Sequence, residues 1–210
     1  MESRIWIASD LHLGHHNILI EKKGIKRQDG YEEEFLSMWS RSVKKDDVVL
    51  LLGDIAFTKQ AYWFDRISKM PGGKILLIGN HDKNRLNWYY KWGFNKVVPF
   101  NESLVYKHWM GNILFTHIPS FIDVLTSYDD RFKGVCLKHE KTFHNTSSIL
   151  NIHGHTHGLA KERHNTFDAT LDVIQNQLVT LEQILELKFK SYKNERAKTH
   201  SNISSVERSV

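Results

Sequence analysis

The feature that most constrains this chain is a series of five short, mostly apolar runs, each followed at once by potential metal ligands. The runs lie at residues 5–8, 48–52, 75–78, 113–115 and 149–152. They are rich in Val, Ile and Leu and end at glycine or a polar residue, which is typical of buried strands. Because the carboxyl ends of strands in an α/β sheet lie at one edge, we expect the polar residues after these runs to converge.

Those polar residues form five blocks. The blocks are Asp10-Leu11-His12, Gly53-Asp54, Gly79-Asn80-His81-Asp82, Thr116-His117 and Gly154-His155-Thr156-His157. They offer two aspartates, one asparagine and four histidines as ligands, whereas a single metal ion needs three or four. Seven ligands, with one carboxylate able to bridge, suit two metal ions side by side. Two-metal sites clamp the attacking and leaving oxygens of a phosphoester displacement, so a phosphoester hydrolase is the leading interpretation.

Five blocks in this order, each after a strand-like run, resemble the calcineurin-like metallophosphoesterase superfamily. The context His117-Ile118-Pro119 is similar to a small bacterial and phage branch of it. The Asp-Arg-Gly that follows the second block in protein Ser/Thr phosphatases is absent, since the chain reads Asp54-Ile55-Ala56-Phe57, and this disfavours a phosphoprotein substrate. The resemblance implies an α/β fold in which a two-layered β-sheet sandwich is flanked by helices, giving four layers in the order α/β/β/α.

The resemblance also implies a role for each block. The first metal ion would be held by Asp10, His12 and His157, the second by Asn80, His117 and His155, and Asp54 would bridge them. His81 would lie beside the phosphate without binding metal, as general acid or transition-state stabiliser. Asp82 would orient His81. His153 is expected to be structural, because strand alternation turns it away from the two histidines that follow.

The expected function is hydrolysis of a phosphodiester by a hydroxide that bridges two divalent metal ions, with a nucleotide or a nucleic-acid fragment as candidate substrates. Mn²⁺ is our first choice of metal, and Fe, Zn²⁺, Co²⁺ and Ni²⁺ also suit imidazole, carboxylate and amide ligands. The main alternative is a nuclease that acts on DNA or RNA. A protein phosphatase and a non-catalytic metal-binding scaffold are less favoured.

Charge and length divide the chain of 210 residues into a catalytic domain at 1–187 and a basic tail at 188–210. The tail has six Lys or Arg against two Glu, so it carries +4 of the formal net charge of +5. The remaining body is nearly neutral, whereas a non-specific DNA-binding surface should be more basic. Nucleic acid stays a candidate partner through the tail, which we expect to be polar and poorly ordered.

No apolar run is long enough to span a membrane, and a strand begins too close to the N-terminus for a signal peptide. The single cysteine, Cys136, has no partner for an internal disulfide. We therefore expect a cytoplasmic protein without a membrane partner.

Between the blocks, amphipathic patterns predict helices at 31–43, 60–70 and 84–92. Residues 97–98, 104–105 and 113–115 are predicted as strands of a second sheet, and 172–184 resembles the closing strand pair and helix of the phage and bacterial branch. The aromatic cluster Trp88–Trp92 has two interpretations, a platform for a nucleobase or part of the core. The insert at 118–154 joins two ligand-bearing strand ends, so it is expected to form a pocket wall or lid with cations for a phosphate.

Overall fold

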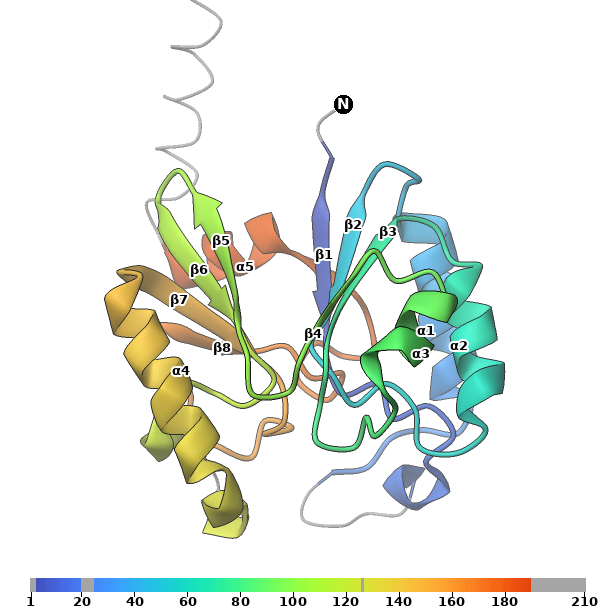
Figure 1. Ribbon diagram of the computed structural model, residues 1–210. Helices are drawn as coiled ribbons and strands as arrows, with labels where there is room; N and C mark the ends of the chain where they lie inside the picture. The colour runs from blue at the N-terminus through green and yellow to red at the C-terminus, as the bar shows by residue number, and fades with distance from the viewer. Residues whose placement is uncertain (1–2, 20–24, 126, 190–210) are drawn as a thin grey trace, which may run out of the picture.

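The predicted strand-forming runs pair into two β-sheets that pack against each other (Figure 1). The computed structural model describes residues 3–19, 25–125 and 127–189. The first sheet has the order β4 (Lys96–Val98), β3 (Gly73–Leu77), β2 (Val48–Leu51), β1 (Ile5–Ala8) and β9 (Val179–Thr180). The second has the order β5 (Leu104–His108), β6 (Gly111–Phe115), β7 (Ser148–His153) and β8 (Thr166–Asp168).

Strand direction brings the ligand blocks together. β1, β2, β3 and β4 are parallel, and only β9 runs antiparallel in the first sheet. In the second sheet β6, β7 and β8 are parallel, and β5 forms an antiparallel pair with β6. The carboxyl ends of β1, β2 and β3 therefore share one edge, and those of β6 and β7 share another.

The chain segments just beyond β1 and β8 join these two edges. Ser9 N–H donates to the carbonyl of Ala169 at 2.8 Å, and Leu171 N–H donates to the carbonyl of Ser9 at 3.2 Å. Ser9 and Thr170 accordingly form an isolated parallel bridge. Backbone hydrogen bonds thus connect the two sheets immediately beside Asp10, the first predicted ligand.

Helices cover both outer faces (Figure 1). On the first sheet lie α1 (Tyr31–Ser42), α2 (Gln60–Ser68) and α3 (Leu86–Lys91), and on the second lies α4 (Lys133–Asn145). The last helix, α5 (Leu181–Lys188), packs near β1. It begins with a capping box in which Thr180 Oγ1 accepts from Gln183 N–H and Gln183 Oε1 accepts from Thr180 N–H.

One large apolar cluster lies between the sheets and beneath the first three helices. It contains Ile7 and Leu50 from the first sheet together with Ile113 and Ile152 from the second, all almost completely buried. Because burial of apolar surface is the main favourable term in folding, this shared cluster holds the two sheets at a fixed spacing. The α/β fold with two sheets flanked by helices, expected from the resemblance, is confirmed.

The sequence placed two segments wrongly. Val97 and Val98 belong to the first sheet, where β4 extends the parallel order beside β3, and not to the second sheet. Short apolar runs do not reveal which strand they will pair with. The expected closing strand pair at 172–184 is also wrong in part, because residues 171–176 form turns and the two late strands, β8 and β9, belong to different sheets. One strand, β9, and the closing helix α5 are found within the predicted segment.

Most of the aromatic cluster at 88–92 packs against the core, which favours the core interpretation over a nucleobase platform, although Tyr90 is 45% exposed. Tyr89 is buried, and its ring centroid lies 5.5 Å from that of Phe64 on α2. Trp88 packs edge-on against Phe64 at 4.8 Å and against Trp92 at 5.8 Å. These rings attach α3 to α2.

Most of the insert at 118–154 serves a structural purpose. It contains two short 3₁₀ helices, η2 (Ile122–Val124) and η3 (Ser127–Phe132), then α4 and β7. Leu114 of β6, Phe121, Val124 and Phe143 form a second small core beneath α4. The end of η3 reaches the predicted ligands, as described below.

The tail predicted at 188–210 lies outside the described residues apart from Lys188 and Phe189. Lys188 is the last residue of α5, and Phe189 packs against the large core. The domain boundary after residue 187 therefore stays a prediction. Within the described ranges, no helix is both long enough and apolar enough to cross a bilayer.

Candidate metal centre

The predicted ligands share an unusual backbone conformation. Five of them have left-handed φ angles that few residues other than glycine adopt. They are Asp10 (54°), His12 (49°), Asp54 (54°), His155 (72°) and His157 (50°). Such residues are strained by about 1–3 kcal/mol each, and strain of this kind is concentrated at functional sites. The turns that follow β1, β2 and β7 therefore orient the ligand side chains at the expense of local stability.

Asp10, His12 and His157 form the first cluster. Asp10 Oδ1 lies 3.5 Å from His12 Nε2 and 3.5 Å from His157 Nε2. All three ligand atoms lie within 4.8 Å of one another. Ligand atoms on a tetrahedral ion with bonds of ~2.1 Å are separated by ~3.4 Å, so this spacing fits a metal ion better than direct hydrogen bonds.

Asp10, Asp54 and His117 form a second cluster of the same size. Asp54 Oδ2 lies 3.7 Å from His117 Nε2 and also 3.8 Å from His12 Nε2 in the first cluster. Asn80 Oδ1 lies 2.9 Å from His117 Nε2. The structure therefore brings Asp54 and Asn80 to His117. Asp10 belongs to both clusters, and Asp54 Oδ2 lies at similar distances from a histidine of each.

His155 lies on the His117 side of the site. The two ring centroids are 5.3 Å apart, and the backbone N–H of His155 donates to Asp10 Oδ2 at 2.8 Å. All seven predicted ligands are thus gathered where the edges of the two sheets meet. His153 is not among them, because its ring is buried and bonded to the carbonyl of Gly154 and to Glu162.

Buried polar atoms without a partner support the fit to a metal ion. Among the described residues, Asp10 Oδ1 and His12 Nε2 are buried and accept or donate no hydrogen bond. A buried polar group without a hydrogen-bond partner lowers the stability of the fold by about 1–3 kcal/mol, and a charged group lowers it by more. Oxygen and imidazole nitrogen are the ligand types that divalent transition ions prefer, so the donor set fits such ions as well.

The pKa values of the clustered side chains also favour metal binding. Burial lowers the pKa of His12 to about 4 and the pKa of His117 to about 3, although Asp10 opposes both shifts. These imidazoles are therefore neutral, which is the form that binds a metal ion. Burial and the nearby carboxylates of Asp10 and Asp82 raise the pKa of Asp54. A bound cation would remove this penalty by offsetting the carboxylate charges.

Glycine is required where two ligand loops cross. A Cβ atom at Gly79 would overlap the Oδ1 atom and the backbone nitrogen of Asp54, and a Cβ at Gly154 would overlap Ser9 Oγ and Asp10 Oδ2. Any side chain at either position would displace a predicted ligand.

The Asp82 carboxylate forms its hydrogen bonds with the backbone of the ligand loops and not with the ring of His81. Its carboxylate accepts backbone N–H groups from Asp54 at 2.7 Å, Ile55 at 3.1 Å and Gly79 at 2.9 Å. Burial raises the pKa of Asp82 to about 6 despite these bonds. The orienting contact that the resemblance implied for Asp82 is therefore made to the backbone of two ligand turns.

His81 lies beside the clusters and is partly open to solvent, with its side chain 40% exposed. Its Nε2 is 4.0 Å from Asp54 Oδ2, and its backbone N–H donates to Asp54 Oδ1 at 2.8 Å. The ring packs against Phe57 at 4.6 Å, and Phe57 in turn stacks on His15 at 3.9 Å with nearly parallel planes. Phe57 therefore restricts the orientation of His81.

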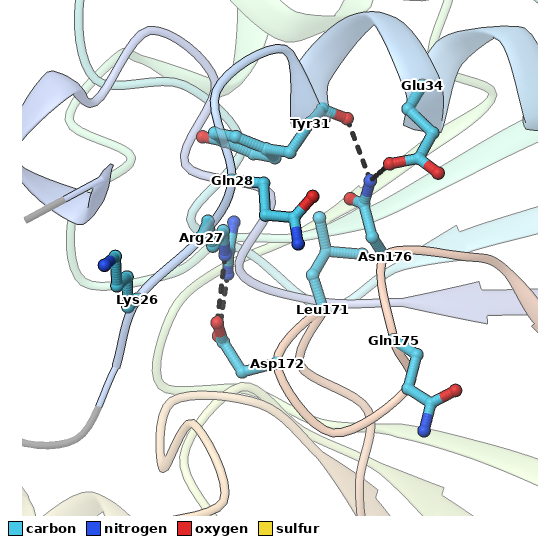
Figure 2. Close-up of a pocket in the computed structure, with 9 residues that line it drawn as sticks. All are labelled: Lys26, Arg27, Gln28, Tyr31, Glu34, Leu171, Asp172, Gln175 and Asn176. Carbon is cyan, nitrogen blue, oxygen red and sulfur yellow. Dashed lines mark hydrogen bonds and ion pairs between the residues drawn. The ribbon is translucent and has the colours of Figure 1, made fainter. Parts of the chain in front are cut away.

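Sequence reasoning missed the residues that orient the first cluster. His157 Nδ1 donates to Asp172 Oδ2 at 2.6 Å. Arg27 donates to both oxygens of Asp172, and Figure 2 shows this pair at the wall of a cavity of about 330 Å³. Arg27 also donates to the carbonyls of Leu11 and Asp10 at 2.8 and 2.7 Å. No local pattern marks an arginine for this position.

A second cavity, of about 410 Å³, opens directly onto the centre. It is lined by residues 78–83 of the third block, Phe100, Arg131 and Phe132. Arg131 and Phe132 come from the end of η3, so the insert does supply one wall of the site, as predicted for a pocket wall. Lys138, another cation of the insert, does not line this cavity and forms an ion pair with Glu102.

Comparisons with known proteins agree with this geometry. The calcineurin-like phosphoesterase family matches residues 3–204. The gene 66 protein of Mycobacterium phage D29 is 29% identical over 173 residues, covering 74% of this chain and 79% of the phage protein. The gene 66 protein of Mycobacterium phage L5 is 37% identical over 83 residues, which cover 38% and 40% of the two chains. A protein of unknown function from Aquifex aeolicus has the same fold, with a TM-score of 0.71 at 23% identity over 89% of this chain and 100% of the other.

Because the family match spans nearly the whole sequence, the chain belongs to the calcineurin-like phosphoesterase family. It is a metallophosphoesterase, an enzyme that hydrolyses phosphoric esters with the help of divalent metal ions. The phage relatives agree with the small bacterial and phage branch that the sequence resembles.

Proposed function

We propose that this enzyme hydrolyses a phosphodiester at a dinuclear metal centre. One metal ion would be held by Asp10, His12 and His157, the other by Asn80, His117 and His155, and both by the bridging carboxylate of Asp54. Mn²⁺ is our first choice among the transition ions that suit these ligands.

The observation that carries the proposal is the position of Asp54. Its Oδ2 atom lies 3.8 Å from His12 Nε2 and 3.7 Å from His117 Nε2, so one oxygen faces a histidine of each cluster. Its other oxygen accepts the backbone N–H of His81. A carboxylate that belonged to one ion only would not need to face both histidines.

The side chains near this carboxylate can perform the remaining chemistry. Two bound cations would supply a nucleophilic water near neutral pH and positive charge for the phosphoryl oxygens. His81 is partly exposed, lies next to the clusters and is kept in place by Phe57, so it is positioned to donate a proton to the leaving alkoxide. Phe100 and Phe132 offer apolar surface beside His81, which favours a diester with an organic group on each side over a small monoester.

Metal analysis tests the bridging role. Protein purified without chelator should contain close to two transition-metal ions per chain by mass spectrometry of the metals, and Asp54→Ala should lose both. Asp65→Ala is the matched control, because this aspartate lies on the exposed surface of α2. Full metal occupancy in Asp54→Ala would contradict the bridge.

Turnover tests the reaction. Bis-para-nitrophenyl phosphate should be a better substrate than para-nitrophenyl phosphate with Mn²⁺ present. A preference for the monoester would show that the enzyme is not a phosphodiesterase.

A further inference from the structure

The wall that the insert contributes to the cavity has a distinct chemical character. Phe132 lies edge-on to His155 at 4.9 Å and to Phe100 at 5.7 Å, and the Arg131 guanidinium lies 4.7 Å from the centre of the Phe132 ring. Phe100 also approaches His117 at 6.1 Å. Two half-buried aromatic rings and an arginine therefore adjoin the side of the centre that contains His117 and His155.

Two cations at this cavity are available for a ligand. Arg131 and Lys83 are both exposed, and neither forms an ion pair with another residue of the described chain. Both line the cavity and neither is a predicted metal ligand, so they are available to a part of the substrate other than the phosphate that is hydrolysed. A guanidinium stacked on an aromatic ring keeps its N–H edges free and can bind a phosphate through two hydrogen bonds.

We propose that Arg131, Phe132 and Phe100 form a subsite for a nucleotide that carries a second phosphate. The rings would pack against the base or sugar next to the scissile diester, and Arg131, assisted by Lys83, would bind the additional phosphate. This inference rests on the phosphodiesterase function proposed above and adds the class of substrate, a short phosphorylated oligonucleotide.

The geometry favours such a ligand over a simple apolar group. An apolar ligand would bury the charges of Arg131 and Lys83 without a partner, which is unfavourable. A bare phosphate ester would leave the two rings without contact. A nucleotide with a second phosphate would contact both the cations and the rings. Its additional phosphate would pair with Arg131 and Lys83. Its base would stack on the rings, and base–aromatic stacking contributes on the order of 1–3 kcal/mol per base in single-strand binding proteins.

Three diester substrates distinguish binding at this subsite from hydrolysis of the diester itself. They are bis-para-nitrophenyl phosphate, the dinucleotide TpT and its 5′-phosphorylated form pTpT. The quantity to compare is the ratio of kcat/KM for pTpT to kcat/KM for TpT. In the wild-type enzyme this ratio should exceed 10, since one charge-assisted hydrogen bond contributes roughly 10- to 100-fold.

Arg131→Ala should bring the ratio to within about threefold of unity, and Arg131→Lys should retain part of the preference. Arg41→Ala, which removes an exposed arginine from α1, should leave the ratio unchanged. Phe132→Leu should raise KM for both dinucleotides by roughly tenfold, whereas Phe132→Tyr, which keeps the ring, should not. Metal content of each variant, measured in parallel, separates loss of the subsite from damage to the centre.

The inference fails if the wild-type enzyme hydrolyses bis-para-nitrophenyl phosphate but treats pTpT and TpT alike, or hydrolyses neither; the proposed function would survive either result. It also fails if Arg131→Ala slows all three substrates equally. An enzyme with full metal content that cleaves no diester would overturn the proposed function and this inference with it.

Discussion

Asp172 accepts a 2.6 Å hydrogen bond from Nδ1 of His157, and the opposite nitrogen of that ring faces Asp10 Oδ1 at 3.5 Å. The carboxylate therefore selects the tautomer whose Nε2 lone pair points into the first cluster. Arg27 holds Asp172 in turn, and the hydrogen bonds of both residues keep the pKa of Asp172 below its usual value although burial acts in the opposite direction. Ligand orientation in the first cluster thus depends on two residues that are not ligands.

Asp172→Asn is expected to weaken metal binding by about 10- to 100-fold, the usual effect of losing a carboxylate behind a histidine ligand. The amide has nearly the same shape, so circular dichroism should be unchanged. Calorimetric titration of the metal-free protein with Mn²⁺ would measure the affinity, with Asp65→Asn as the surface control. Unaltered affinity would show that the His157–Asp172 bond does not position the ligand.

His81→Ala is expected to slow diester hydrolysis by roughly 10²–10⁴-fold while the metal content stays the same, because we assign His81 to proton transfer and not to metal binding. The loss should be largest for alkoxide leaving groups, which need the proton most. The measurement is kcat for a series of diesters with leaving groups of increasing pKa. Equal losses along the series would leave His81 only an electrostatic role.

Gly79→Ala is expected to disrupt the centre, because the new methyl group would overlap the Asp54 carboxylate and backbone nitrogen. Both metal content and thermal stability should fall. The matched control is Gly134→Ala on α4, where an added Cβ meets nothing within 4 Å and alanine favours a helix by up to about 1 kcal/mol. Retention of both metals by Gly79→Ala would show that the loop can move away from Asp54.

Asp47 should stabilise the first sheet in a pH-dependent way. It is 4% exposed and accepts from Trp6 Nε1 at 2.9 Å and from the backbone N–H groups of Arg4 and Lys44, each at 2.9 Å. Burial alone would raise the pKa of Asp47, but these bonds outweigh it and lower the pKa below its ordinary value. We expect Asp47→Asn to lower the free energy of unfolding by about 1–3 kcal/mol at neutral pH.

The sign of the pH effect follows from the lowered pKa. The stabilisation should be complete above the unfolded pKa of about 3.9 and should disappear as the pH falls through the folded value. Urea unfolding of wild type and Asp47→Asn between pH 7 and pH 3 would measure it. A difference between the two proteins that stays constant down to pH 3 would exclude the carboxylate as its source.

The strands and the ligand blocks were predictable because both are local. The five apolar runs correspond to β1, β2, β3, β6 and β7, and the structure brings the polar residue after each run to one site. An apolar run that is followed by a turn and a ligand must place that ligand at a strand end, whatever the rest of the fold. Local signals failed for β4, because a run of three residues can pair in either sheet and only the available edge decides.

By itself, the sequence determined which side chains enter the centre and the class of chemistry they favour, since residue type and position after a strand are properties of short segments. Only the tertiary structure decided what surrounds them. Arg27 and Asp172 are 145 residues apart in the chain, and Phe132 meets His155 only because the insert folds back across β7. Such contacts form when distant segments pack into one core, and no periodicity or motif in either segment encodes the partner it will find there.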